Sequence, residues 1–255
     1  MILFFSGCGN SRFVAEELAQ KTNDRLCQID PTEEKPCIEL GNGEALGIVC
    51  PVYAWAIPRI VRDWLLRLSI NNSPDYLYLA CTCGDNVGMT PEQMDKELQK
   101  KGMHLDAAFS FVMPETYVNL KAFKLDTPEN ANRKIETVRK RLPLVAEKII
   151  KREHVTDVVR GNMPKITTYL VNPLFYRLLI TDRKFYAGQA CINCGKCVQV
   201  CPLHNITMDE GHPRWNGNCT NCMACYHHCP TDAIQFGKAT VGKGRYYFGM
   251  TSNSL

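Results

Sequence analysis

Short apolar runs alternate with longer amphipathic stretches from the first residues to about Met113. The apolar runs have the length and composition of buried strands, and five of them can be recognised: Ile2–Phe5, Leu26–Ile29, Leu46–Cys50, Tyr76–Cys81 and Ala107–Met113. Between them apolar residues recur at helical spacing, as they do every three or four positions from Ile57 to Leu68. Strands that alternate with helices predict an α/β fold in which helices cover a parallel sheet.

A longer helix and a connector follow the last predicted strand. Thr127 and Pro128 are residue types that open a helix, and apolar residues keep a helical rhythm from there to Ile149. Pro143 lies inside this stretch, where we expect it to kink or interrupt the helix. From 154 to 187 the periodicity weakens while aromatic residues stay frequent, which favours a packed connector over a flexible tether.

Residues 1–153 therefore predict a doubly wound α/β domain with a five-stranded parallel sheet. Such sheets bind ligands beyond the carboxyl ends of their strands, near the point where the strand order reverses. Three loops follow the first, third and fourth predicted strands at that edge: Ser6–Ser11, Pro51–Pro58 and Thr82–Gly88. We expect the chemistry of this domain to lie in these loops.

Cysteine is concentrated in one part of the chain. The 255 residues include 14 cysteines, and eight of them lie between Cys191 and Cys229. They form two runs of the pattern Cys-x-x-Cys-x-x-Cys-x-x-x-Cys-Pro, and the second run begins at Cys219, 28 residues after the first. Because the same offset relates Ile206 to Ile234, the repeat extends beyond the cysteines and indicates a duplicated structural unit.

The spacing of these runs is typical of two cubane 4Fe–4S clusters, in which the fourth cysteine of each run crosses to the other cluster. The predicted ligand sets are Cys191, Cys194, Cys197 and Cys229 for one cluster, and Cys219, Cys222, Cys225 and Cys201 for the other. Zinc sites usually combine two cysteine pairs and require neither the third cysteine nor the proline. With all eight cysteines present, we expect His227 and His228 to pack or to face solvent rather than bind iron.

Charge and hydropathy limit the classes of protein to which the chain can belong. The start of the chain lacks the basic segment and cleavage site of a signal peptide, so we expect a cytoplasmic protein whose thiols stay reduced. No run approaches the roughly 18 apolar residues of a transmembrane helix. The net charge of +4 arises in residues 121–160, where 11 Lys and Arg accompany 6 Asp and Glu. This basic region is expected to be a solvated helix face or a docking patch for an acidic partner, and we expect no nucleic-acid binding. Residues 238–255 carry no interpretable pattern.

Residues 188–237 resemble a bacterial-type ferredoxin with two 4Fe–4S clusters, on the strength of both complete cysteine runs. The resemblance implies a small α+β domain in which each cluster carries one electron.

The loop Ser6-Gly7-Cys8-Gly9-Asn10-Ser11 resembles the phosphate loop of flavodoxins, which wraps the phosphate of FMN with backbone amides and hydroxyls. Backbone N–H groups at a helix N-terminus bind anions without help from Lys or Arg. Gly and Asn are also ordinary turn residues, so the loop alone leaves both interpretations open. It departs from the flavodoxin pattern at Cys8, where Thr or Ser is usual and a thiol is the weaker donor. Cys8 therefore predicts weaker flavin binding, or a domain that has lost its flavin.

The other two loops suit the flat ring of a flavin. Tyr53 and Trp55 could stack against the ring, or they could cap the core at the end of a strand. The loop that begins at Thr82 has glycine and short polar groups for the ring edge, or for a plain turn, and Tyr117 could cover the site or pack in the core. The predicted FMN-binding residues are Ser6, Gly7, Cys8, Gly9, Asn10, Ser11, Pro51, Val52, Tyr53, Ala54, Trp55, Thr82, Cys83, Gly84, Asp85 and Asn86.

Nearly the whole chain resembles flavodoxin–ferredoxin fusion proteins. The resemblance implies an electron-transfer protein that passes electrons between FMN and two 4Fe–4S clusters, and on to redox partner proteins. One alternative is an FMN-dependent oxidoreductase that uses the clusters as its electron port. A built-in nicotinamide site is not indicated, because no Gly-x-Gly-x-x-Gly opens a βαβ unit. A second alternative is a ferredoxin with a flavin-free docking domain, and no catalytic residue can be assigned.

Overall fold

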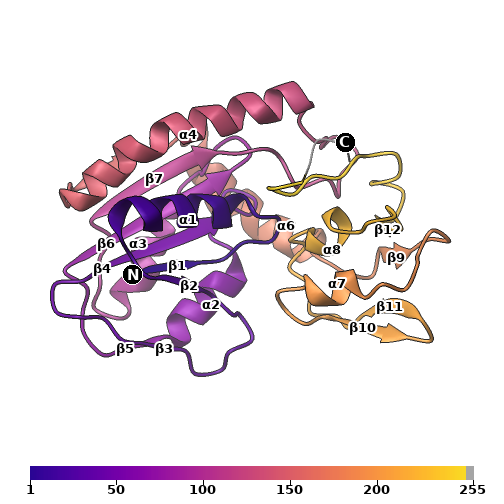
Figure 1. The fold of residues 1–255 in the computed structure, drawn as a ribbon, viewed down its shortest axis with the longest axis horizontal. Coiled ribbons are helices and arrows are strands. Elements are labelled where there is room, and N and C mark those ends of the chain that lie inside the picture. The colour runs from indigo at the N-terminus through magenta and orange to yellow at the C-terminus, as the bar shows by residue number, and fades with distance from the viewer. Residues whose placement is uncertain (251–255) are drawn as a thin grey trace.

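Residues 1–250 of a computed structural model define the fold, which is dominated by one large sheet (Figure 1). All of its neighbouring strands pair in parallel, in the order β2-β1-β4-β6-β7-β8. The strand bounds are β1 (Ile2–Phe4), β2 (Leu26–Gln28), β4 (Ala45–Pro51), β6 (Tyr76–Cys83), β7 (Ala107–Val112) and β8 (Val155–Asp157). The order reverses between β1 and β4, as in flavodoxin-like doubly wound sheets. The predicted α/β fold class is confirmed.

Helices cover both faces of this sheet. One face carries α1 (Asn10–Thr22) and α4 (Pro128–Ile150), and the other carries α2 (Arg59–Arg67) and α3 (Thr90–Gln99). A separate pair of very short parallel strands, β3 (Cys37–Ile38) and β5 (Ser69–Ile70), lies outside the main sheet.

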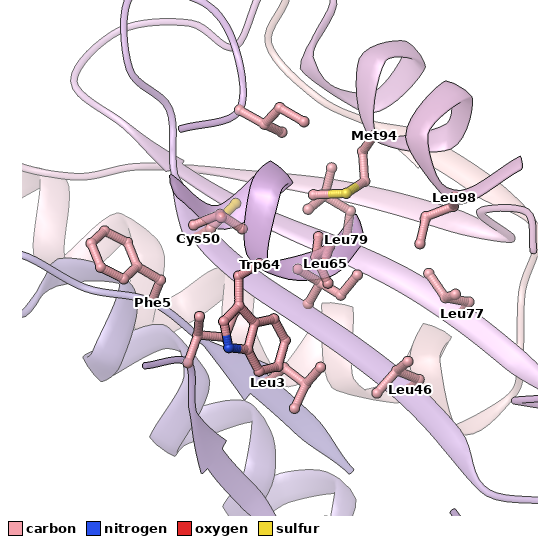
Figure 2. Packing of buried hydrophobic residues seen from close by; sticks show 14 of the residues in the cluster. Leu3, Phe5, Leu46, Cys50, Trp64, Leu65, Leu77, Leu79, Met94 and Leu98 are labelled. Atoms are coloured by element: carbon pink, nitrogen blue, oxygen red, sulfur yellow. The ribbon is translucent and has the colours of Figure 1, made fainter. Parts of the chain in front are cut away.

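Successive side chains of each strand enter the two cores alternately. Leu77 and Leu79 join the core under α2 and α3, whereas Tyr78 joins the core under α1 and α4. Figure 2 shows the first of these cores, where Trp64 of α2 lies beside Leu3 of β1. Burial of these side chains fixes the strand ends from which the predicted ligand loops leave.

Gly47 in β4 makes room for a ring of the neighbouring strand. It is the register partner of Tyr78 in β6, and a Cβ at Gly47 would overlap the phenol ring. Because Tyr78 is fully buried, its ring has no free space to enter. We expect Gly47→Ala to lower the free energy of unfolding by about 1–3 kcal/mol, measured by anaerobic chemical denaturation. Gly41→Ala, at a site with ordinary Cβ contacts, is the control, and equal stability of the two variants would contradict this account.

Two features of the sheet domain differ from the sequence prediction. The sheet has a sixth strand, β8, which lies just beyond residue 153 and pairs with β7. It is only three residues long, too short to show a strand pattern. In addition, Pro143 does not interrupt α4. Leu142 and Val145 beside it are buried against the sheet, and this packing outweighs the hydrogen bond that proline removes.

A helical connector follows β8. It consists of α5 (Pro164–Ile166), a π-helical turn (Thr167–Val171) and α6 (Asn172–Leu178). Thr168 and Asn172 are buried on its inner face, while Leu170 and Leu174 on its outer face are exposed. The connector is therefore packed on one face only.

The rest of the chain forms a small α+β domain, as expected. Its strands form two antiparallel pairs, β9 (Phe185–Ala187) with β12 (Ile234–Phe236) and β10 (Ile206–Asp209) with β11 (His212–Trp215). Two one-turn helices, α7 (Lys196–Gln199) and α8 (Ala224–His227), begin 28 residues apart. The offset of the cysteine runs is thus also the offset of the structural repeat.

Residues 238–250 turn back from the small domain to the sheet domain (Figure 1). The Phe248 ring stacks on the Phe13 ring of α1, with centroids 4.2 Å apart. The Lys243 ammonium donates hydrogen bonds to the carbonyl oxygens of Val118 and Leu120. This part of the predicted tail therefore ties the two domains together, and residues 251–255 lie outside the described residues.

Candidate functional site

A cavity of about 210 Å³ lies where the loops after β1, β4 and β6 meet. Every predicted FMN-binding residue lines it except Gly9, which is covered by Phe248. Other walls come from parts of the chain that the sequence did not link to this site: the loop after β7, the connector through Phe175 and Ile180, and Thr220–Met223 of the small domain. The cavity is therefore built by both domains and the connector.

The loop Ser6–Ser11 ends at the N-terminus of α1. Gly9 precedes the helix with φ 91°, and its N–H donates to Ser6 Oγ at 3.1 Å. Ser11 Oγ lies 2.7 Å from Thr82 Oγ1, which joins this loop to the end of β6. The first turn of α1 has no acidic residue, so the positive end of the helix dipole is uncompensated at the cavity. These features suit a phosphate group.

Cys8 acts at the junction between the two domains. Its buried thiol donates a hydrogen bond to the carbonyl oxygen of Cys222 at 3.3 Å. Burial raises the pKa of Cys8 well above its usual value, so the thiol stays protonated. Its own carbonyl oxygen accepts from the N–H of Phe248 at 2.8 Å. Because the thiol donates to Cys222 O, it does not replace the hydroxyl donor that Thr or Ser would offer a phosphate, and weaker flavin binding at Cys8 stays a prediction.

The residues Tyr53–Ala56 form a tight turn at the cavity. The N–H of Tyr53 donates to Ala56 O at 2.9 Å, and the N–H of Ala56 donates to Tyr53 O at 3.3 Å. The two central residues, Ala54 and Trp55, both have left-handed backbone conformations, with φ 47° and 63°. This is a type I′ turn without the Gly or Asn that it usually requires. Each such residue costs about 1–2 kcal/mol, so the surrounding structure must hold the turn in place.

The connector supplies that support. Thr168 Oγ1 donates to Trp55 O at 2.6 Å and accepts from the N–H of Met89. Asn172 Nδ2 donates to both Tyr53 O and Ala54 O at 3.0 Å. Three successive carbonyl groups of the strained turn are thus satisfied by two buried side chains from more than a hundred residues away. The turn places Tyr53 and Trp55 in the cavity wall.

A half-buried carboxyl group, that of Glu115, lies beside the loop after β6. Glu115 Oε1 accepts from the N–H groups of Thr116 and Tyr117 at 2.9 and 2.7 Å. The carboxyl lies against Gly84, where a Cβ would overlap it, and Lys134 Nζ donates to Gly84 O at 3.0 Å. Burial raises the pKa of Glu115, so its charged form is disfavoured.

Aromatic rings enclose the cavity on the side of the connector. The Tyr117 ring lies 5.5 Å from the Phe175 ring and 5.9 Å from the Phe123 ring, measured between centroids. Tyr117 Oη and Asn221 Oδ1 are buried without a hydrogen-bond partner in residues 1–250. Both residues line the cavity. Burial raises the pKa of Tyr117 to about 12 and the nearby Asn221 side chain opposes this rise, so the two groups can bond to each other or to a bound polar group. Apolar rings, unpaired polar atoms and a helix N-terminus together fit a flavin with a phosphate tail.

The eight cysteines of the two runs fall into two groups in space. The first group lines a second, smaller cavity and consists of Cys191, Cys194, Cys197 and Cys229. In the second group, Cys201 lies close enough to three cysteines of the other run for their charges to interact: Cys219, Cys222 and Cys225. The fourth cysteine of each run therefore lies with three of the other, which is the arrangement that two 4Fe–4S clusters need.

The sulfur atoms have surroundings that suit iron. The N–H of Asn205 donates to Cys201 Sγ, and the N–H of Asn221 donates to Cys219 Sγ, both at 3.3 Å. Such bonds stabilise thiolates bound to a cluster. Burial raises the pKa of Cys219 and Cys222 to about 12, so thiolates there need the compensating charge of iron. In residues 1–250 no three Cys, His, Asp or Glu side chains converge closely enough to hold a single metal ion.

The two cysteine groups differ in their distance from the flavin cavity. The group with Cys201, Cys219, Cys222 and Cys225 is named the proximal group, because Cys222 itself lines that cavity. A Cβ at Gly7 would lie only 3.0 Å from Cys222 Cβ, so the phosphate loop and the proximal group touch. The other four cysteines are the distal group, in which Cys194 is exposed beside the exposed Ile192.

His227 links the small domain to the loop after β7 and to the returning segment 238–250. Its Nδ1 accepts from the N–H of Tyr246 at 3.2 Å, which leaves Nε2 to donate to Thr116 O at 2.8 Å. Burial lowers the pKa of His227 to about 3, so the ring is neutral in this role. His227 is therefore packed in the interior, which is one of the two positions expected from the sequence.

We expect His227→Phe to lower the free energy of unfolding by about 1–3 kcal/mol, because the change keeps the ring but leaves a buried carbonyl and a buried N–H without partners. Anaerobic denaturation measures this loss. His212→Phe, at an exposed position of β11, is the control, and a loss of equal size in the two variants would show that the hydrogen bonds of His227 contribute nothing.

Comparisons with known proteins agree on the small domain. Residues 190–234 match the family described as a 4Fe-4S dicluster domain. A ferredoxin of Pyrobaculum islandicum is 37% identical over 67 residues, which cover 23% of this chain and 62% of that ferredoxin. The chain thus spans less than two thirds of that relative. The small domain is ferredoxin-like and carries the cysteines of a 4Fe–4S dicluster domain.

A structural likeness was also found to a solved protein of Bacteroides uniformis, described as a candidate flavoprotein. It is 13% identical, with a TM-score of 0.36 over 44% of this chain and 88% of that chain. A score this low carries no argument, so the flavodoxin-like assignment rests on the strand order of the sheet. The chain joins a flavodoxin-like sheet to a ferredoxin-like dicluster domain.

Proposed function

We propose that this chain transfers electrons between an FMN in the interdomain cavity and external redox proteins, through a proximal and then a distal 4Fe–4S cluster. The observation that carries the proposal is the position of Cys222, which belongs to the proximal cysteine group and lines the cavity that the flavin loops form. Electrons tunnel best over short distances, and no other cysteine of the two runs lines this cavity. The exposure of Cys194 supports a distal cluster close to the surface, where a partner can dock.

Within this proposal the residues of the chain bind, orient and shield the cofactors. The loop Ser6–Ser11 holds the FMN phosphate, and the turn that carries Tyr53 and Trp55, with the loop Thr82–Asn86, holds the ring. Cys191, Cys194, Cys197 and Cys229 hold the distal cluster, and Cys219, Cys222, Cys225 and Cys201 the proximal one. FMN, when bound, exchanges electron pairs for the single electrons that the clusters carry.

The proposed units are residues 1–153 for flavin, 154–187 as the connector and 188–237 for the clusters. Thiolate-bound clusters require reducing conditions, for which we propose the cytoplasm. The basic region 121–160 is a weaker candidate for partner docking, since several of its cations are paired with carboxylates of the same chain. Lys134 pairs with Asp126 and Arg141 with Asp157, both at 2.8 Å.

Reduced, fully loaded protein mixed anaerobically with cytochrome c tests the proposed route. We expect rapid reduction of cytochrome c by the unmodified chain and slow reduction by Cys194→Ser, which lacks the distal cluster. Cys37→Ser, an exposed cysteine outside both groups, is the control and should match the unmodified chain. Equal rates for Cys194→Ser and the unmodified chain would mean that electrons leave without the distal cluster, and the proposed route would be wrong.

A flavin-dependent oxidoreductase is the second candidate, and Glu115 favours it. A half-buried carboxyl with a raised pKa in the cavity wall is suited to proton transfer to a small substrate. Anaerobic mixing with NADH or NADPH separates the two functions. A pure carrier leaves its flavin oxidised, whereas prompt bleaching of the flavin supports the enzyme. The third interpretation, a flavin-free docking domain, predicts that purified protein releases no flavin on acid treatment.

A further inference from the structure

The connector presents an apolar stripe to solvent. Six large apolar side chains on it are 50% to 68% exposed: Met163, Ile166, Tyr169, Leu170, Leu174 and Leu178. They recur every three or four residues, so they share one face of the helical segment. A surface helix ordinarily turns its apolar face inward. Here the inward face carries the polar Thr168 and Asn172, which are occupied by the turn at the flavin cavity.

The charges within the sequence of this stripe are of one sign. From Val158 to Thr181 the chain contains Arg160, Lys165 and Arg177 but no Asp or Glu. Arg160 is paired with Glu92 of α3, with Nη1 and Oε2 2.9 Å apart, so Lys165 and Arg177 are the cations that the stripe itself offers. The next acidic residue, Asp182, is buried, and its carboxylate accepts from Asn205 Nδ2 at 3.0 Å and from the N–H of Gly217 at 2.7 Å. Its charge is therefore used inside the domain.

Exposed cations accompany the stripe at both ends. Lys165 lies at its start and Arg177 at its end, and the exposed Arg183 and Lys184 follow. A face that combines clustered apolar side chains with cations alone is complementary to a surface that is apolar inside and anionic outside.

We propose that the stripe Met163–Leu178 lays the protein on an anionic lipid surface. Amphipathic helices with apolar and cationic side chains lie in the plane of the membrane interface, with their apolar face in the headgroup region. The attachment is peripheral, since no helix within residues 1–250 is both long and apolar enough to cross a bilayer. This inference goes beyond the proposed electron transfer and requires neither flavin nor clusters.

A second copy of the chain fits this face less well. In a two-fold dimer the same surface meets itself, so the cations beside one stripe would meet those beside the other. Lys165 and Arg177 would then approach like charges, with no exposed carboxylate between Val158 and Lys184 to pair with them. Anionic headgroups supply that missing charge.

Docking on lipid would place the flavin cavity close to the membrane. Phe175 of α6 lines the cavity, and Leu178, three residues later, belongs to the exposed stripe. The segment that contacts lipid is thus the segment that holds the Tyr53–Ala56 turn.

Flotation of the full-length protein with vesicles tests the inference. We expect binding to vesicles of equal parts phosphatidylcholine and phosphatidylglycerol, and little binding to phosphatidylcholine alone. Leu170→Ser/Leu174→Ser should weaken binding to the anionic vesicles about tenfold or more, because it removes apolar surface from the interface. Lys165→Gln/Arg177→Gln should weaken the preference for anionic lipid. All four side chains are exposed, so the fold is expected to survive, and unchanged cluster absorbance checks this.

The matched control is Leu144→Ser/Ile150→Ser on α4, whose side chains are 62% and 61% exposed and lie in the basic region 121–160. It should bind like the unmodified protein. The inference is overturned if the protein binds neither kind of vesicle, if it binds both equally, or if the control loses as much binding as the stripe variant. It is also overturned if sedimentation without lipid finds a dimer that Leu170→Ser/Leu174→Ser dissociates, since the stripe would then be an interface between copies.

Discussion

Cys201→Ser is expected to remove the cluster next to the flavin cavity and to spare the distal one, although Cys201 belongs to the same run as three distal cysteines. In space Cys201 lies with Cys219, Cys222 and Cys225. Serine keeps the size of the side chain but not the soft thiolate that iron–sulfur clusters need. The iron content should fall by about half, and electron transfer from the flavin to the distal cluster should become slow.

Two further variants sharpen this prediction. Cys229→Ser should remove the distal cluster instead and leave the proximal one, since Cys229 lines the cavity of the distal group. Cys37→Ser should leave both clusters intact. Iron analysis and low-temperature electron paramagnetic resonance of the reduced proteins identify the surviving cluster. Loss of the distal cluster in Cys201→Ser would show that each run binds its own cluster and that the crossing assignment is wrong.

Replacing both connector side chains beneath the strained turn should disable the flavin site. In Thr168→Val/Asn172→Leu the shapes are nearly kept, but the carbonyl groups of Ala54 and Trp55 lose their donors and the N–H of Met89 loses its acceptor, while Tyr53 O keeps only the N–H of Ala56. Unpaired groups of this kind cost about 1–3 kcal/mol each, so the free energy of unfolding should fall by about 3–5 kcal/mol. The left-handed turn would relax, and flavin affinity should drop by at least about tenfold.

The adjacent threonine offers a control for this variant. Thr167 Oγ1 bonds only within its own helical segment, to the carbonyl oxygens of Met163 and Pro164, and Thr167→Val should leave flavin binding unchanged. Flavin affinity is measured by titration of FMN into flavin-depleted protein. If Thr168→Val/Asn172→Leu binds FMN as tightly as the unmodified chain, the turn is not the support of the flavin ring.

The pattern of apolar residues was sufficient to predict the sheet and the strand ends at which the cavity lies. Hydrophobic periodicity indicates which segments are buried strands. The loops after β1, β4 and β6 follow the carboxyl ends of such strands, which is where parallel sheets bind ligands. The same reasoning missed β8, which has three residues, and expected an interruption at Pro143 that packing of α4 prevents. Propensity is a weak guide where tertiary contacts decide.

The walls of the cavity outside these loops could not be predicted from the sequence. Phe175, Ile180 and Cys222 line the cavity because the connector and the small domain dock on the sheet, and no local pattern records that docking. The same docking brings Thr168 and Asn172 to the turn at the cavity. The cysteine runs predicted which residues group together but not that one group would touch the phosphate loop. The sequence suggests a weak phosphate donor at Cys8, and in the structure its thiol donates to Cys222 O of the proximal group.

The central claim is that one chain holds a flavin beside a pair of iron–sulfur clusters. It is tested most directly by counting iron, sulfide and flavin per chain in protein purified without oxygen, with the absorption spectrum recorded on the same sample. The account predicts about eight iron atoms, about eight sulfides and about one FMN per chain. About four iron atoms, or full clusters without any flavin, would contradict it.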